Sequence, residues 1–155
     1  MQFIYDSIDS GNFVISVFID FKKAFDTVGH KILLSKLDVY GIRAVSHEWL
    51  KSYHSERNQI TVIDGITSSS SSISWSSTRV CPVGPLLFLI FINDLPKSSS
   101  LFKFILFADD SPLSTSFAEE NALEFTLTLN HDLNNVNNWL TSNRISINAD
   151  KTKYI

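Results

Sequence analysis

Two aspartate positions follow strand-like apolar runs, and they limit what this chain of 155 residues can fold into. Asp20 closes the run FVISVFID at residues 13–20, and Asp109–Asp110 close FKFILFADD at residues 102–110. Runs rich in β-branched and aromatic residues are typical of β-strands. Carboxylates that two strands bring together repel one another unless a cation lies between them. The sequence therefore predicts a strand end and a hairpin that hold divalent metal ions.

Each carboxylate also has a simpler interpretation when it is taken alone. Asp20 could be a turn-capping residue, and adjacent aspartates such as Asp109–Asp110 are common in turns. An unpaired aspartate at the end of an apolar strand is costly to bury, which favours a partner for it. Pro112 argues against a regular hairpin, because it lacks a ladder donor at the start of the return strand. Only the combination of three carboxylates on two strand-like elements favours a metal site.

The composition limits the partners that the chain can have. Its hydrophobic content of 44% is enough for a real core, but its net charge of −3 and pI of about 5.7 are wrong for a free-standing nucleic-acid binder. A single cysteine, Cys81, excludes an intramolecular disulfide and fits a reducing compartment. The longest apolar run, PLLFLIFI at residues 85–92, is shorter than the ~20 residues of a membrane span. The N-terminus has no signal-peptide pattern.

The spacing of apolar residues predicts helices and strands in a mixed order. The predicted elements are a strand at 13–20, a helix over about 27–40 that Gly41 ends, a helix through 45–53, a strand at 59–64, a polar loop at 67–72, a helix over 84–94, a hairpin of 101–107 and 112–117, a helix over 118–140 and a strand at 144–148. This order favours a single α+β domain in which helices pack on one face of one sheet.

Four blocks of sequence, in this order, resemble the reverse transcriptase domain of non-LTR (LINE-type) retrotransposons: FIDFKKAFDTVGHKILLSKLDVYGI, GPLLFLIFINDLP, FILFADD and WLTSNRISINADKTKYI. The resemblance runs from about residue 13 to the end of the chain, and its specificity lies in the ordered set. It implies a right-hand polymerase palm with a ferredoxin-like sheet. The implied reaction is template-directed DNA synthesis, with RNA as the template in the native element.

The resemblance also implies roles for individual residues. Asp20 matches the first metal ligand of the family, and Asp109 and Asp110 match its catalytic Asp-Asp pair. They would hold two Mg²⁺ or Mn²⁺ ions that activate a primer 3′-hydroxyl and neutralise phosphates. Phe25 matches an aromatic residue that excludes a 2′-hydroxyl, but without a metal site it is a core aromatic. Lys151 matches a lysine that lies near the nucleotide phosphates in the family. The alternative interpretation is that Lys151 is a solvated surface lysine.

The implied partners are an RNA template, a DNA primer and deoxynucleoside triphosphates. Family members carry a basic fingers region before the first catalytic strand, a thumb after the last and usually an endonuclease domain. The chain has 12 residues before its first strand and ends at Ile155, so we expect residues 1–155 to be a partial domain that is not processive alone. The lineage indicates a nuclear or cytoplasmic protein that is not secreted, with no membrane partner.

Residues 75–82 depart from the family. Its members carry Gly-Val-Pro-Gln-Gly-Ser-Val-Leu before GPLLF, whereas this chain reads WSSTRVCP. One back-translation of WSSTRVCP, read one base later, encodes the family motif, so our hypothesis is a frameshift before Trp75 and a compensating one near Val83. Ordinary divergence is the alternative. As written, the bulky Arg79 and Val80 would stand where a close approach of the backbone to a nucleotide is needed. A catalytically inactive remnant that at most binds metal or a partner is therefore the second interpretation, and an unrelated α+β metal-binding domain is the third.

Overall fold

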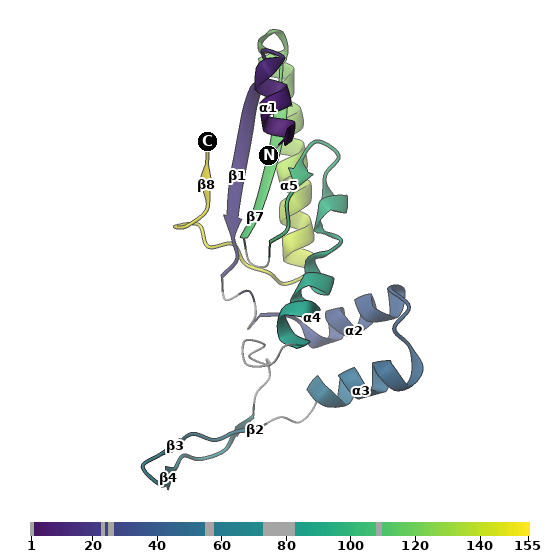
Figure 1. Cartoon of the computed structure of the whole chain (residues 1–155), viewed down its shortest axis with the longest axis vertical. Helices are drawn as coiled ribbons and strands as arrows, with labels where there is room; N and C mark the ends of the chain where they lie inside the picture. The colour runs from purple at the N-terminus through teal and green to yellow at the C-terminus, as the bar shows by residue number, and fades with distance from the viewer. Residues whose placement is uncertain (1, 23, 25–26, 55–57, 73–82, 108–109) are drawn as a thin grey trace. The chain divides into compact units, whose positions relative to one another are not determined.

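The computed structural model describes residues 2–22, 24, 27–54, 58–72, 83–107 and 110–155 (Figure 1). The chain divides into two compact units. One consists of Met1–Ala24 with Ile92–Ile155, and the other is Phe25–Phe91. The first unit contains the central sheet, and the second consists of helices and two short ribbons.

The first unit is built on a four-stranded sheet in the order β6-β7-β1-β8, and every neighbouring pair is antiparallel. Its strands are β1 (Phe13–Asp20), β6 (Lys103–Phe104), β7 (Asp110–Phe117) and β8 (Lys153–Tyr154). The two central strands pair along their whole length, from Phe13 opposite Phe117 to Asp20 opposite Asp110. This sheet confirms the α+β class that the sequence predicts.

Register divides the side chains of β1 and β7 between two faces, because successive residues of a strand point to opposite sides. The odd-numbered residues form the core face, on which Ile19, Leu113 and Thr115 are each at most 4% exposed. Helix α5 (Ala122–Ser142) packs on this face, where the ring of Phe125 stacks on that of Phe117 with centroids 4.4 Å apart. The amphipathic helix predicted over 118–140 is therefore confirmed.

The even-numbered residues form the opposite face of the sheet. Ser16 and Ser114 are buried there, with their hydroxyl oxygens 2.8 Å apart. Lys103 pairs with Ser114, and its Nζ lies 4.1 Å from the ring centre of Phe3 in helix α1 (Gln2–Asp9). Helix α1 therefore lies on this second face, at the end of the sheet where β1 begins (Figure 1). The prediction of helices on one face alone is wrong, because the sequence did not reveal α1.

The second unit contains α2 (His30–Val39), α3 (Ala44–His54) and all of α4 (Val83–Ile92) except its last residue. Gly41 follows α2 with φ +88°, a left-handed conformation that glycine adopts without strain, and it ends the helix as predicted. The Lys36 ammonium donates a hydrogen bond of 2.7 Å to the Phe91 carbonyl, one of the carbonyls that the end of α4 leaves without a helical partner.

Several predicted strands differ from the observed ones. The segment 59–64 contributes to two separate ribbons, which pair β2 (Asn58–Gln59) with β5 (Ser71–Ser72) and β3 (Val62–Ile63) with β4 (Ile66–Thr67). The Ser-rich stretch 67–72, predicted as a loop, therefore includes β5 and the end of β4. The segment 144–148 is not a strand, since Ile147 makes only an isolated bridge with Phe21 and the closing strand is β8. Two 3-10 helices, η3 (Leu95–Ser98) and η4 (Glu119–Asn121), also belong to the first unit.

Within the described residues, no helix is both long and apolar enough to cross a membrane.

Candidate active site

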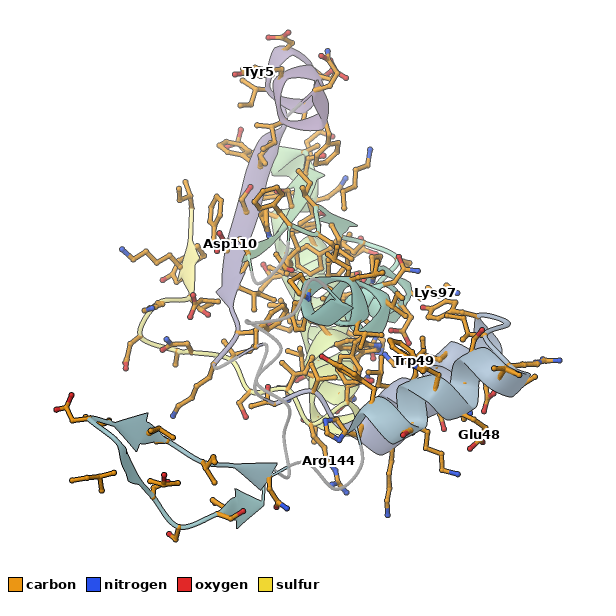
Figure 2. The ribbon with its side chains drawn as sticks, turned by 60° about the horizontal axis from the view of Figure 1, so that its bottom comes forward. Tyr5, Glu48, Trp49, Lys97, Asp110 and Arg144 are labelled. Atoms are coloured by element: carbon orange, nitrogen blue, oxygen red, sulfur yellow. The ribbon has the colours of Figure 1, made fainter. Side chains whose placement is uncertain are left out.

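The structure brings two of the predicted metal ligands together. Asp20 is the last residue of β1 and Asp110 is the first residue of β7, and they are direct partners in the antiparallel register. Both belong to the even-numbered face of the sheet. They lie at the end of the sheet away from α1, as the labels of Asp110 and Tyr5 show in Figure 2.

The backbone hydrogen bonds show which kind of pair Asp20 and Asp110 form. The Asp20 N–H donates to the Thr152 hydroxyl at 3.4 Å, and the Asp20 carbonyl accepts from the Asn148 N–H at 2.8 Å. Asp110 exchanges both of its backbone bonds with Phe107, each at 3.0 Å. Since neither aspartate directs its backbone groups at the other, they are a non-hydrogen-bonded pair. In such pairs the Cα atoms are only ~4.5 Å apart and the side chains are closest.

The pair opens into a cavity of about 510 Å³ whose lining lies wholly in the first unit. The residues that line it are Phe18, Ile19, Asp20, Phe107, Asp110, Ser111, Pro112 and Lys151. The N–H of Lys151 donates to the Asn148 carbonyl at 3.1 Å, in the same segment that bonds the Asp20 backbone. The lining of this cavity therefore includes one basic residue, Lys151, together with the two aspartates, and the role of Lys151 stays a prediction.

A divalent cation fits this donor set. Neither carboxylate forms an ion pair with any residue that the structure describes. Like charges directly opposite one another on two strands are destabilising, and carboxylate oxygens are preferred ligands of Mg²⁺ and Mn²⁺. No three His, Cys, Asp or Glu side chains come together as possible ligands among the described residues. Asp109, the third predicted ligand, and Phe25 lie outside those residues, so both assignments stay predictions.

With this geometry in place, the comparison with known proteins is direct. Residues 7–155 match the family described as reverse transcriptase (RNA-dependent DNA polymerase). The chain belongs to the reverse transcriptase family. This confirms the resemblance predicted from the four sequence blocks.

Relatives of this reverse transcriptase-family chain come from mobile elements. It is 24% identical over 164 residues to the RNA-directed DNA polymerase from mobile element jockey of Drosophila melanogaster. It is 26% identical over 159 residues to the jockey polymerase of Drosophila funebris. Both alignments cover 97% of this chain and 17% of the relative, so the chain spans only a small part of these proteins.

A solved structure supports the fold. Telomerase from Candida albicans, in a complex with a fragment of telomeric RNA, matches 99% of this chain and 29% of its own chain. The TM-score is 0.55 and the sequence identity is 13%, so this likeness concerns the fold alone. It agrees with an α+β arrangement of helices on an antiparallel sheet.

Several residues around the carboxylates were missed by the sequence reasoning. Phe18 and Phe107 line the cavity and are 44% and 75% exposed, and Asn148 and Thr152 bond the Asp20 backbone. For Phe18 a signal was available, because a side chain two positions before Asp20 in a strand shares its face. The other three are far from Asp20 in sequence, and only the fold brings them near it.

Ser111, next to the carboxylate pair, gives a stability prediction. It is 1% exposed, and its hydroxyl has no hydrogen-bond partner among the described residues. A buried unsatisfied polar group costs about 1–3 kcal/mol, so we expect Ser111→Ala to raise the free energy of unfolding by about 1 kcal/mol in a urea titration. The matched variant Ser114→Ala should lower it, because it leaves the Ser16 hydroxyl without its partner. A loss of stability in Ser111→Ala would contradict this assignment.

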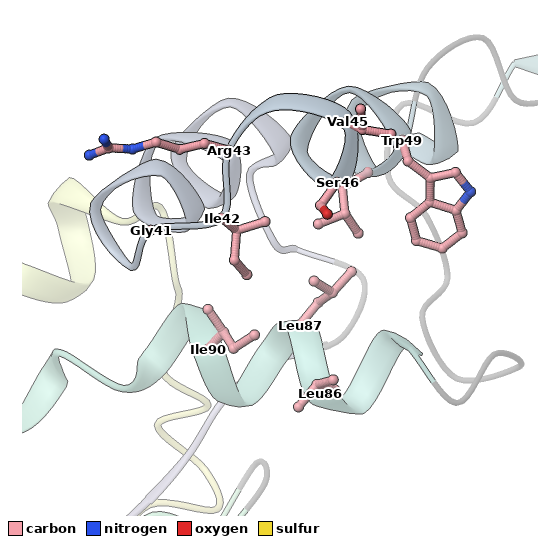
Figure 3. A pocket seen from close by; sticks show the side chains of 10 residues that line it. Gly41, Ile42, Arg43, Val45, Ser46, Trp49, Leu86, Leu87 and Ile90 are labelled. Carbon is pink, nitrogen blue, oxygen red and sulfur yellow. The ribbon is translucent and has the colours of Figure 1, made fainter.

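A second cavity, of about 760 Å³, lies in the second unit between the α2–α3 turn, α3 and α4. Figure 3 shows Ile42 on one side of it, facing Leu87 and Ile90 of α4 on the other. Its lining is mostly apolar and includes one charged residue, Arg43, and no carboxylate. It therefore lacks the ligands that a divalent metal needs, and the carboxylate cavity remains the candidate active site.

Proposed function

We propose that this chain carries the metal-binding palm of the RNA-directed DNA polymerase of a non-LTR retrotransposon. One observation carries the proposal: Asp20 and Asp110 form a narrow cross-strand pair in a reverse transcriptase-family chain. Under this proposal the four-stranded sheet is the ferredoxin-like palm. The location of the protein would be the nucleus or cytoplasm, where template and chromosomal DNA are found.

Asp20 and Asp110, with Asp109 as a third ligand, would hold two Mg²⁺ or Mn²⁺ ions. When bound, such ions lower the pKa of a primer 3′-hydroxyl and stabilise the leaving pyrophosphate. Lys151 would place a positive charge at the edge of the same cavity, where it favours the triphosphate of a deoxynucleotide. Phe18 and Phe107 offer exposed rings on which a base or sugar can stack. Phe25 would exclude a 2′-hydroxyl.

The partners would be an RNA template, a DNA primer and deoxynucleoside triphosphates. With a net charge of −3 the chain supplies little phosphate-neutralising surface. Because it spans 17% of its jockey relatives, we expect fingers, thumb and endonuclease regions of a full-length element to supply the rest. Residues 1–155 would then be a partial domain that extends a primer slowly and without processivity.

The alternative function is an inactive remnant that keeps the metal site alone. The sequence WSSTRVCP at residues 75–82 favours it, because it replaces the glycines of the family motif. These residues lie outside those that the structure describes. The frameshift hypothesis therefore stays a prediction about the nucleotide sequence.

Primer extension separates the two functions. The chain is supplied with a poly(rA) template, an oligo(dT) primer, dTTP and Mg²⁺ or Mn²⁺. We expect metal-dependent extension that Asp110→Asn reduces by roughly 10²–10³-fold or more, as for loss of a group that stabilises a transition state. The control Asp64→Asn makes the same chemical change in the second unit, at φ +50°, which asparagine tolerates, and should keep the activity.

A third variant tests the damaged segment directly. It replaces residues 75–82 by Gly-Val-Pro-Gln-Gly-Ser-Val-Leu. Activity in this variant, but not in the chain as written, would establish the inactive remnant and support the frameshift. Extension that persists in Asp110→Asn would contradict the metal site itself.

A further inference from the structure

A buried carboxylate on α5 holds the turn that leads into β6. Asp132 is 6% exposed, and its Oδ2 accepts hydrogen bonds from the Ser99 hydroxyl at 2.5 Å and the Leu101 N–H at 2.9 Å. The Ser99 oxygen in turn accepts from the N–H groups of Leu101 and Phe102, at 3.1 and 3.0 Å. The Ser99 bond is the main reason that the pKa of Asp132 lies below its ordinary value. A buried charge with these partners ties the turn firmly to α5.

The segment that follows this turn, residues 103–107, is called the β6 arm here. Few backbone hydrogen bonds hold it to β7. β6 has only two residues and lies at the edge of the sheet. Beyond it, the Ile105 N–H donates to the Pro112 carbonyl at 2.9 Å, but Pro112 has no N–H to return a bond. Only then do Phe107 and Asp110 exchange two bonds. A ladder this short, with a bond missing in its middle, holds the arm to β7 by few hydrogen bonds.

A slip of this arm would alter the candidate active site. Moving a strand by one residue turns every side chain to the other face of the sheet, so Phe107 would leave the cavity wall that it forms beside Asp110. The anchored turn opposes such a slip, because the bonded Leu101 N–H lies only two residues before Lys103, the first residue of β6. Helix α5 cannot follow the slip, since it packs on the core face of the same sheet.

We propose that Asp132 is a positioning residue that sets the register of the β6 arm and thereby keeps Phe107 opposite Asp110 in the cavity wall. The hydrogen bonds of Asp132 to Ser99 and Leu101 help to fix the register of the arm, because the ladder lacks a backbone donor at Pro112. The relevance of this role to catalysis rests on the proposed polymerase function. The positioning itself is a property of the fold and is measurable without it.

Amide hydrogen exchange in the full 155-residue chain, followed by NMR, tests the proposal. In Asp132→Asn we expect the Ile105 and Phe107 amides to exchange about tenfold faster, on the scale of losing a hydrogen bond to a charged group. The Ile145 amide, which donates to the Leu140 carbonyl in the same unit, serves as the internal reference and should change much less. Asp9→Asn makes the same chemical change at an exposed site on α1 and should leave both arm amides unchanged.

A second variant distinguishes positioning from general stability. Pro112→Val restores the missing N–H, so in this background Asp132→Asn should accelerate exchange at Phe107 by less than about threefold. Ser99→Ala removes the three hydrogen bonds of the Ser99 hydroxyl but leaves the bond from the Leu101 N–H to Asp132, and it gives a second test if Asp132→Asn folds poorly. Equal acceleration at Ile145, no acceleration at Phe107, or the same effect with and without Pro112→Val would each overturn the proposal. These exchange rates are measured without metal or nucleotide, so their result does not depend on the result of primer extension. Failure of this proposal can therefore be distinguished from failure of the proposed polymerase function.

Discussion

Asp20→Asn and Asp110→Asn are expected to abolish the stabilisation of this chain by Mn²⁺ while raising its stability in the absence of metal. In the wild-type chain, a metal that binds the folded state alone adds RT ln(1 + [Mn²⁺]/Kd), which is about 2.7 kcal/mol at a hundredfold excess over Kd. Each variant loses a carboxylate ligand and should lose most of this increment. Without metal, each variant relieves the repulsion of two facing carboxylates and should gain about 0.2–1 kcal/mol.

The opposite signs of the two effects make this test specific. Thermal unfolding is measured with Mn²⁺ and with a chelator, and Asp64→Asn serves as the matched control that should behave as the wild type in both. Asp109→Asn should behave like the other two site variants if it is the third ligand. An equal Mn²⁺ response in wild type, Asp20→Asn and Asp64→Asn would place the metal elsewhere and remove the basis of the proposed function.

The sequence predicted the carboxylate end of the sheet better than its other edges. The run FVISVFID is apolar and β-branched throughout, so the position of Asp20 at its end follows from local pattern. The pairing of Asp20 with Asp110 depends on a register between strands that are far apart in the sequence, which local pattern does not contain. The four family-like sequence blocks, taken in order, indicated that Asp20 and Asp110 belong to one site. The same holds for Lys151, which reaches the cavity through a segment that bonds the Asp20 backbone.

The missed elements have physical causes. The segment 144–148 alternates like a strand, but β1 ends at Asp20, so the segment makes only an isolated bridge, between Ile147 and Phe21. The strand predicted over 59–64 stops at Ile63, because Asp64 and Gly65 both adopt positive φ and form the turn between β3 and β4. Helix α1 was missed because it is only eight residues long, although its apolar residues recur at helical spacing. For the segment 144–148, the extent of the partner strand rather than its own composition decides its structure.

The second large effect is expected on the core face of the same strand. Leu113 is fully buried on the odd-numbered face of β7, three residues beyond Asp110. Leu113→Ala should lower the free energy of unfolding by about 2–5 kcal/mol, because it removes buried methyl groups and leaves a cavity. For a domain whose total stability is roughly 5–15 kcal/mol, this is a large fraction. A urea titration measures it, and Leu127→Ala, at 70% exposure on α5, should change stability by no more than about 0.5 kcal/mol.

Leu113→Ala also tests whether the two faces of the sheet act separately. The carboxylate pair belongs to the even-numbered face, so the truncated chain should keep its increment of stability from Mn²⁺ even though its baseline falls. The aspartate variants should show the reverse, with a slightly raised baseline and no increment. Equal costs for Leu113→Ala and Leu127→Ala would contradict the face assignment. Loss of the Mn²⁺ increment in Leu113→Ala would mean that packing behind β7, and not the register alone, holds Asp20 and Asp110 together.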